Sequence, residues 1–360
     1  HSVRGSKTNA NAELDLIGRF RLSPERGGFW SETRLSFWAL GNHTIGGTQS
    51  TSAFSRGAGL LWDSNDGDAP DPDWLLGIFA LQQDFDAGSF SGTIELGKVY
   101  PGSSLAVLPL TGDDRDGFMS QIISSDAAGR WFDRIGLGIS LNIKSDLWFA
   151  TALVSDATAQ DRGFDFDTVG DGSNLVAVEF GVTPKIAGRA SKFAVMPYVI
   201  NQSDSFSREK GLVVTFSHDL FGVDAVGIAP VTVFGRYTAR SGGEPRTDAA
   251  LDDARNLRRG GFLGIAIDRP FGRDAEQIGV AVMQGTASAA AKSKGFGSQK
   301  GVEAFCNRKK LVLVFNQKSA NPKHVNIKND IISNLKKVAK NNYHDHYLLG
   351  VITKINKDSV

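Results

Sequence analysis

The chain has 360 residues, 41% of them hydrophobic, and its 40 basic and 39 acidic side chains give a formal net charge of +1. This hydrophobic share permits a folded core, but no run approaches the roughly 18 consecutive apolar residues that a membrane-spanning helix requires. The sequence therefore excludes a helical membrane protein. It leaves open a membrane β-barrel, in which each strand carries only a weak apolar signal.

Charge and residue types divide the chain near residue 289. Residues 289–360 hold 14 Lys and Arg against 4 Asp and Glu, whereas all six Trp come before them. We predict two domains with different histories: residues 1–288, and a basic Lys/Asn-rich tail of residues 289–360. The single cysteine, Cys306, lies in the tail. A first domain without Cys fits a protein of an oxidising envelope that does not rely on disulfides.

Apolar residues at every second position recur through the first domain and predict β-strands. In one such segment Ile135, Leu137, Ile139, Leu141 and Ile143 alternate with glycine or polar residues. A strand turns successive side chains to opposite faces, so one face is apolar and the other small or polar. We count about thirteen strands, most near the ~9–11 residues that a tilted strand needs to cross a bilayer. They include residues 14–22, 34–39, 74–85, 88–100, 135–144, 147–154, 174–186, 192–200, 211–221, 230–240, 260–271 and 276–285.

The connections between these strands alternate in length. Short turns lie at residues 86–88, 145–146 and 187–191, and they alternate with long polar loops at residues 63–73, 101–130, 155–173 and 241–259. Short turns at one end and long loops at the other are typical of outer-membrane barrels. A soluble β-sandwich also alternates, but these strands are too many and too long for one sandwich. Their second face also carries Gly, Ser, Thr, Glu and Arg, which suit a solvated interior better than a packed one.

Several stretches, taken in order, resemble the OprB family of carbohydrate-selective porins. They are GGFWSETRLSFWALG (27–41), FSGTIELGKVYPGSSLAVL (90–108), WFDRIGLGISLNIKSDLWFATALVSDA (131–157), VFGRYTARSG (233–242) and RRGGFLGIAIDRPFGRDAEQIGVAVMQGTAS (258–288). The resemblance covers residues 12 to 288 and implies an all-β fold, an antiparallel transmembrane β-barrel of porin type. It also implies the outer membrane of a Gram-negative-type cell as the location.

The sequence departs from this family at its end. Such porins usually have sixteen strands and finish on an aromatic residue, whereas here the barrel-like pattern stops at residue 285 and the chain ends Asp-Ser-Val. We therefore expect an incomplete barrel, in which the closing strands are missing or are replaced by the tail. An open barrel would expose unpaired backbone groups to lipid, each at a cost of several kcal/mol.

The expected function is passive diffusion of carbohydrates, other small polar solutes and ions, without a catalytic step, cofactor or metal. Outer-membrane lipid would surround the pore, and a monomer and a homotrimer both remain open. Candidates for lining the pore or contacting solute on the polar face are Arg19, Arg21, Arg34, Trp38, Glu95, Arg134, Glu179 and Arg236, and Lys98 matches a basic strand-end residue of the family. Arg guanidinium groups and carboxylates bind sugar hydroxyls, and the face of a Trp ring can stack on a pyranose ring. Candidates for a constriction loop are Asp113, Asp114, Arg115 and Asp116.

Two other classes of function remain as alternatives. One is a soluble or surface β-rich binding protein. The other is a barrel enzyme, which would need a Ser/His pair facing outward at one rim, and His218 is its only candidate. No Ser lies in a G-x-S-x-G motif. The acidic stretches 66–73 and 165–172 suggest calcium, but neither has the complete EF-hand spacing, so acidic extracellular loops explain them better.

The tail follows a different pattern. Residues 309–318 and 347–355 predict strands, and Ile327, Ile331, Leu335 and Val338 lie at helical spacing with a Lys-rich opposite face. We expect a small basic α/β unit. Its positive charge suits nucleic acid or an anionic surface, although a lysine-rich solvated face explains it as well.

Overall fold

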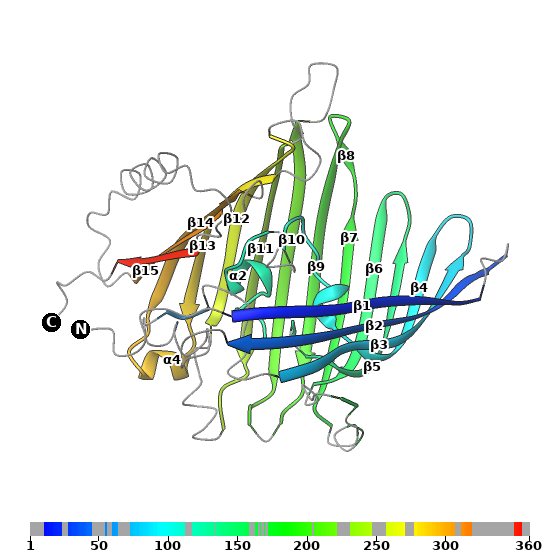
Figure 1. Ribbon diagram of the computed structural model, residues 1–360, viewed down its shortest axis with the longest axis horizontal. Helices are drawn as coiled ribbons and strands as arrows, with labels where there is room; N and C mark the ends of the chain where they lie inside the picture. Colours follow the sequence, from blue (N-terminus) through cyan, green and yellow to red (C-terminus); the bar gives the residue numbers. More distant parts are fainter. Residues whose placement is uncertain are drawn as a thin grey trace.

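The computed structural model describes the chain in ranges separated by gaps. The ranges are 11–23, 28–44, 55, 60–63, 73–111, 117–132, 134–157, 163–164, 166, 169, 172–203, 205–221, 231–246, 257–270, 277–306, 311–318 and 349–354. None of the helices found among these residues is long and apolar enough to cross a membrane. Most of the described chain is β-structure (Figure 1).

The strands follow the alternating segments of the sequence. They are β1 (Asn11–Ser23), β2 (Trp30–Thr44), β3 (Asp73–Asp86), β4 (Ser91–Val99), β5 (Gly136–Lys144), β6 (Trp148–Asp156), β7 (Asn174–Val182), β8 (Lys185–Ile186), β9 (Arg189–Ile200), β10 (Glu209–Phe221), β11 (Val231–Gly242), β12 (Leu257–Asp268), β13 (Gln277–Ala287), β14 (Ser298–Cys306), β15 (Leu311–Lys318) and β16 (Leu349–Lys354). Short helical segments are η1 (Pro101–Ser103), α2 (Gln121–Ser124) and α4 (Ala289–Ser293).

These strands form one continuous sheet. Each strand pairs antiparallel with the next along the chain, except that β8 only extends the hairpin with β9 and that β16 pairs parallel with β15. The predicted all-β antiparallel fold is therefore confirmed. The hydrogen-bonded order runs from β1 to β16 without pairing those two end strands, so the described sheet is not closed.

The two rims of the sheet differ in the length of their connections. Residues 87–90 and 145–147 make short turns along the upper and right-hand margin of Figure 1, which we call the short-turn rim. The long connections 45–72, 100–135 and 157–173 all leave from the opposite margin, the long-loop rim. This is the alternation that the sequence predicted, and it is the arrangement found in outer-membrane barrels.

The sheet has two faces of different chemistry. Strand β7 shows the alternation most clearly: Val176, Val178 and Phe180 are 42–52% exposed, whereas Ala177 and Glu179 are 1% exposed. We call the face that contacts residues 60–63 and 101–135 the inner face, and the other the outer face. On β5, Ile139 lies on the outer face as predicted, but Ile135, which precedes the strand, is buried.

Two apolar clusters fill much of the inner side. One joins Trp62, Phe118 and Ile122 of the inserted segments to the inner face of β11–β14, and Phe118 packs edge-on against Phe305. The other joins Leu105, Trp131 and Phe132 to β3, β4, β6, β7, β9 and β10. The segments that precede β3 and β5 therefore fold inward and cover a large part of the inner wall.

The sheet continues beyond residue 288. Strand β14 pairs with β13 over nine residue positions, from Ser298 opposite Thr286 to Cys306 opposite Ile278. Its inner-face residues are buried and its outer-face residues are exposed or half-buried, as in the strands before it. The backbones of β15 and β16 extend the same sheet, which agrees with the two strands predicted for the tail. The predicted tail helix at 327–338 lies outside the described residues, and the division near residue 288 stays a prediction.

Candidate functional site

Charged side chains form a ladder on the inner face of β1–β3. Arg34 and Asp84 form a bidentate ion pair. The distance from Nη1 of Arg34 to Oδ2 of Asp84 is 2.6 Å, and the distance from Nη2 to Oδ1 is 2.8 Å. The Nε of Arg21 donates to Oε1 of Glu32 at 3.2 Å, and Arg34 Nη1 lies 3.7 Å from the same oxygen. These side chains remain accessible, because Arg21 is 62% exposed, Arg34 26% and Asp84 22%.

A second polar group continues the ladder across β2–β5. Glu95 accepts hydrogen bonds from Gln82 Nε2 and Ser140 Oγ, both at 3.2 Å. Gln82 in turn accepts from Ser36 Oγ at 2.8 Å, and Arg19 lies close enough to interact electrostatically with Glu95. Charged and amide groups thus cross four neighbouring strands on one face.

Trp38 forms the aromatic part of this wall. Its Nε1 donates to Oδ1 of Asp15 at 2.5 Å, and its ring lies 5.3 Å from the ring of Tyr100. Because the indole N–H is satisfied, the side chain is held in one orientation. One aromatic face therefore lies beside the charged ladder.

Other predicted pore residues hold the inserted segment instead. Glu179 accepts a hydrogen bond from the backbone N–H of Ala106 at 2.9 Å, and Arg236 Nη2 donates to the carbonyl oxygen of Ile123 at 2.8 Å. Arg134 lies before β5, where its Nε donates to the carbonyl oxygen of Arg130 at 2.9 Å. These three side chains fasten loop backbone and are not arranged along an open wall.

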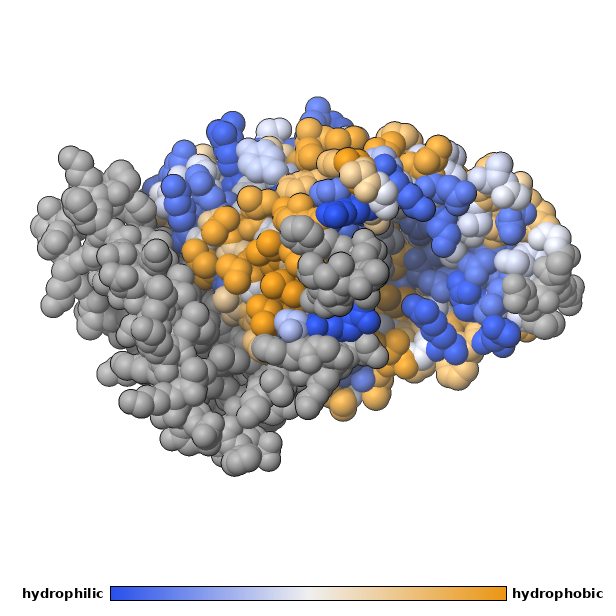
Figure 2. Space-filling model, turned by 90° about the horizontal axis from the view of Figure 1, so that it is seen from above, coloured by the Kyte–Doolittle hydropathy of each residue, from blue (hydrophilic) through white to orange (hydrophobic). Residues whose placement is uncertain are grey.

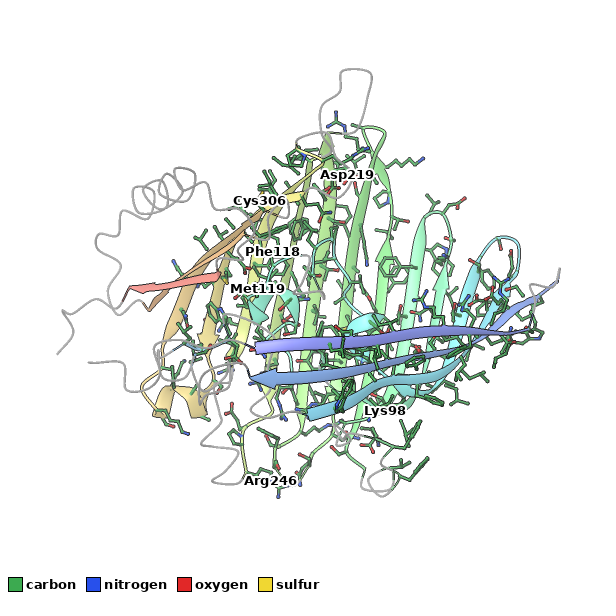
Figure 3. The ribbon with its side chains drawn as sticks, in the orientation of Figure 1. Lys98, Phe118, Met119, Asp219, Arg246 and Cys306 are labelled. Carbon is green, nitrogen blue, oxygen red and sulfur yellow. The ribbon has the colours of Figure 1, made fainter. Side chains whose placement is uncertain are left out.

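Lys98 lies on the outer face. It is opposite Phe79 and Leu137 in the strand register, and Gly97 before it has a φ of +140°. Lys98 is 1% exposed, and its Nζ donates to the carbonyl oxygen of Gly163 (Figure 3). The family motif that suggested a lining role therefore marks a residue that binds a loop on the outside of the wall.

Asp126 is the centre of a buried polar cluster in the inserted segment. Its Oδ2 accepts from Thr238 Oγ1 at 2.7 Å and from Trp131 Nε1 at 2.9 Å, and its Oδ1 lies 3.7 Å from Arg236 Nε. Burial raises the pKa of this carboxyl above its ordinary value, although Arg236 and the two hydrogen bonds act in the opposite direction. The cluster ties residues 126–131 to β11.

A further buried group, missed in the sequence, completes this attachment. Glu209 accepts from Tyr198 OH at 2.7 Å and from Arg240 Nη1 at 3.1 Å, and the backbone N–H of Arg130 reaches it at 3.3 Å. Arg240 and Glu209 are 2% and 0% exposed. Both lie on the inner face of their strands. In the sequence, the only sign of this pair was that each charge falls on the strand positions expected to face inward.

The inner wall is consequently divided into two parts. On β10–β14 four inward charges, Glu209, Arg236, Arg240 and Glu303, are buried under the inserted segments, where Phe118 and Met119 lie (Figure 3). On β1–β3 they are accessible. In the view from above, hydrophilic side chains gather around a recess to the right of centre (Figure 2).

The remaining predicted sites contribute little within the described ranges. Asp113, Asp114, Arg115 and Asp116 lie outside the described residues, as do residues 66–72. No group of three or more His, Cys, Asp or Glu able to hold a metal occurs in the part of the chain that the structure describes. Ser191 Oγ lies 2.8 Å from Nδ1 of His218 at the short-turn rim of the outer face. Among the described residues no third group is bonded to His218, whereas a hydrolase uses such a group to orient its base.

No protein-family model and no curated protein matches the chain. Two solved structures from Pseudomonas aeruginosa, OccK7 (OpdD) and OccK9 (OpdG), align over 82% of this chain at 10% and 11% identity, with TM-scores of 0.36 and 0.33. They are covered over 82% and 80% of their own lengths. The high-pH structure of Pseudomonas putida OprB aligns over 82% of this chain and 78% of its own length, with a TM-score of 0.63 at 11% identity. The chain has the fold of a porin β-barrel.

The OprB-like fold agrees with the geometry of the two faces. Its outer wall is apolar, the inner face of β1–β3 carries accessible charges, and segments between strands fold inward. The likeness rests on the structure, because the identity of 11% is too low to place individual residues of one chain on the other.

Proposed function

We propose that this chain is an outer-membrane porin of a Gram-negative-type cell, for passive diffusion of carbohydrates and other small polar solutes. The observation that supports this most is the accessible ladder of Arg21, Glu32, Arg34 and Asp84 on the inner face of a wall whose outer face is apolar. Such a wall suits lipid on one side and water on the other.

The proposed path runs between the inserted segments and the inner face of β1–β4. Guanidinium groups donate hydrogen bonds to sugar hydroxyls, and carboxylates accept hydrogen bonds from them. Arg34 and Asp84 can therefore each replace their mutual ion pair by hydrogen bonds to a passing sugar. Trp38 offers an aromatic surface beside them. Selection would arise from passing contacts, without bond making or breaking in the solute.

Single-channel recording in a planar bilayer tests this function. We expect stepwise ionic conductance that sugars block in a concentration-dependent way, and block by a neutral sugar separates solute binding from simple charge effects. A chain that stays monomeric and soluble without detergent, and gives no conductance steps, would instead support the soluble binding protein.

A further inference from the structure

Basic side chains form a row on the outer face at the long-loop rim. Lys210, Arg259 and Lys300 are the second or third residues of β10, β12 and β14, and all three are exposed. Arg258 is also exposed, at an irregularity where the register between β12 and β13 shifts. The three strands all begin at this rim, so their first residues lie at the same end of the wall.

The register places uncharged residues between these cations. Lys210 lies opposite Ser241 of β11, and Arg259 lies opposite Ala239 on one side and Thr286 on the other. Lys300 lies opposite Gln284 of β13. Successive cations are two strands apart, at about 4.8 Å per strand, and are offset by two residues along the strands, so they are separated by about 12 Å.

No acidic side chain neutralises the row within the described ranges. The acidic residues of these strands lie at inner-face positions, so they point away from the basic row. They are Glu209, Asp219, Asp268 and Glu303. None of the three cations forms an ion pair with a described residue. The positive charge is therefore uncompensated by the wall itself.

The row borders an apolar band. Leu212, Tyr237, Leu263 and Val282 follow toward the middle of the outer face and are 47–52% exposed. At the opposite end of β10–β14, the described outer-face positions within the strands carry His218, Ile278 and Cys306, and one basic residue, Arg269, follows β12 there. Asp219 and Cys306 mark that end in Figure 3, and Arg246 marks the long-loop rim. Within the described strands β10–β14, the outer face therefore carries its Lys and Arg at the long-loop rim.

We propose that Lys210, Arg258, Arg259 and Lys300 bind the phosphate groups of anionic lipid headgroups in the leaflet next to the long-loop rim. This inference rests on the proposed membrane function. If the apolar band lies in hydrocarbon, the row lies at the level of the headgroups. Guanidinium and ammonium groups are the usual protein ligands of phosphate. A soluble anion would have no reason to contact the adjoining apolar surface, whereas a lipid contacts both.

The test measures lipid binding to the full chain in neutral detergent by native mass spectrometry. The probes are lipid A, which carries phosphates, and phosphatidylcholine as the lipid without net charge. The triple variant Lys210→Gln, Arg259→Gln, Lys300→Gln is compared with Lys144→Gln, Lys185→Gln, Arg189→Gln, which removes the same charges at the short-turn rim.

We expect lipid A to bind the first triple variant at least about tenfold more weakly than the wild type, since each basic residue near a membrane surface contributes about 1 kcal/mol. The second variant should bind like the wild type, and phosphatidylcholine should not distinguish the three proteins. Equal lipid A binding by both variants overturns the proposal, and so does displacement of lipid A by inorganic phosphate. Channel recording on the same samples reports separately on the porin function, which the first variant should retain.

Discussion

The carboxylate of Glu303 accepts a hydrogen bond from the backbone N–H of Met119 at 2.7 Å. The neighbouring N–H of Ser120 donates to the other oxygen at 3.1 Å. The two partners are 184 residues apart in the chain, and Glu303 is fully buried. A residue of the expected tail therefore holds the inserted segment of the barrel, so β14 takes part in the same structure as the strands before it.

Glu303→Ala is expected to loosen the inserted segment. The substitution leaves two buried N–H groups without an acceptor, at a cost of about 1–3 kcal/mol for each group that water does not reach. Urea unfolding in detergent should show a lower midpoint, and a protease should cut the 117–132 region faster than in the wild type.

Glu303→Gln serves as the matched variant. It preserves one acceptor oxygen and most of the side-chain volume, so its midpoint should lie between those of the wild type and Glu303→Ala. If Glu303→Gln were as stable as the wild type, packing and not the hydrogen bonds would explain the loss in Glu303→Ala.

Asp126→Asn is expected to change how stability depends on pH. Burial raises the pKa of Asp126 in the folded state, so the folded protein keeps a proton that the unfolded chain has released. The contribution of this carboxyl to stability is full below its ordinary pKa of 3.8 and is lost as the pH rises through the folded value. The unfolding midpoint of the wild type should therefore fall relative to that of Asp126→Asn as the pH rises from below 3.8.

The measurement is the difference between the two unfolding midpoints over a series of pH values. The amide of the variant does not titrate, and its oxygen can still accept from Thr238 and Trp131. A difference that stays constant with pH would show that burial does not control the titration of Asp126.

Arg34→Gln is expected to shift the ion selectivity of the channel toward cations. The substitution removes a positive charge from the accessible wall and releases Asp84 from its bidentate partner. The reversal potential in a salt gradient measures the shift, and it should decrease at high ionic strength because salt screens exposed charges.

Lys98→Met is the matched control for that experiment. It also removes one positive charge, but from a residue that is buried on the outer face and bonded to Gly163. We expect its reversal potential to equal that of the wild type. A shift as large as that of Arg34→Gln would place Lys98 on the solute path after all.

Gly97→Ala is expected to destabilise the β3–β4 pair. Gly97 has a φ of +140°, and an added Cβ would meet the carbonyl oxygen of Phe79. Backbone strain of this kind costs about 1–3 kcal/mol. Gly28→Ala is the control, because Gly28 has a φ of +132° with no atom within 4 Å of an added Cβ. The unfolding midpoint should fall further for Gly97→Ala, and equal losses would attribute the effect to φ alone.

The strands, their two faces and the alternation of short and long connections could be predicted from the sequence. These features depend on local pattern, because each residue in a strand faces opposite to its neighbours whatever lies beyond it. Leu14, Leu16 and Phe20 alternate with polar residues in the sequence, and they are 47–55% exposed on the outer face. The accessible Arg21 and Arg34 follow from the same parity.

Only the tertiary structure decided which of the inward-facing charged side chains are accessible to solvent and which are buried. Glu179, Arg236 and Glu303 obey the same parity as Arg34, but the inserted segment covers them, and its contacts join residues far apart in the chain. Lys98 lies three residues after Glu95, so alternation already places it on the outer face, and only the tertiary structure shows that it is buried there against Gly163. Strand parity is a property of the local backbone, whereas burial of a charge depends on which distant segment packs against it.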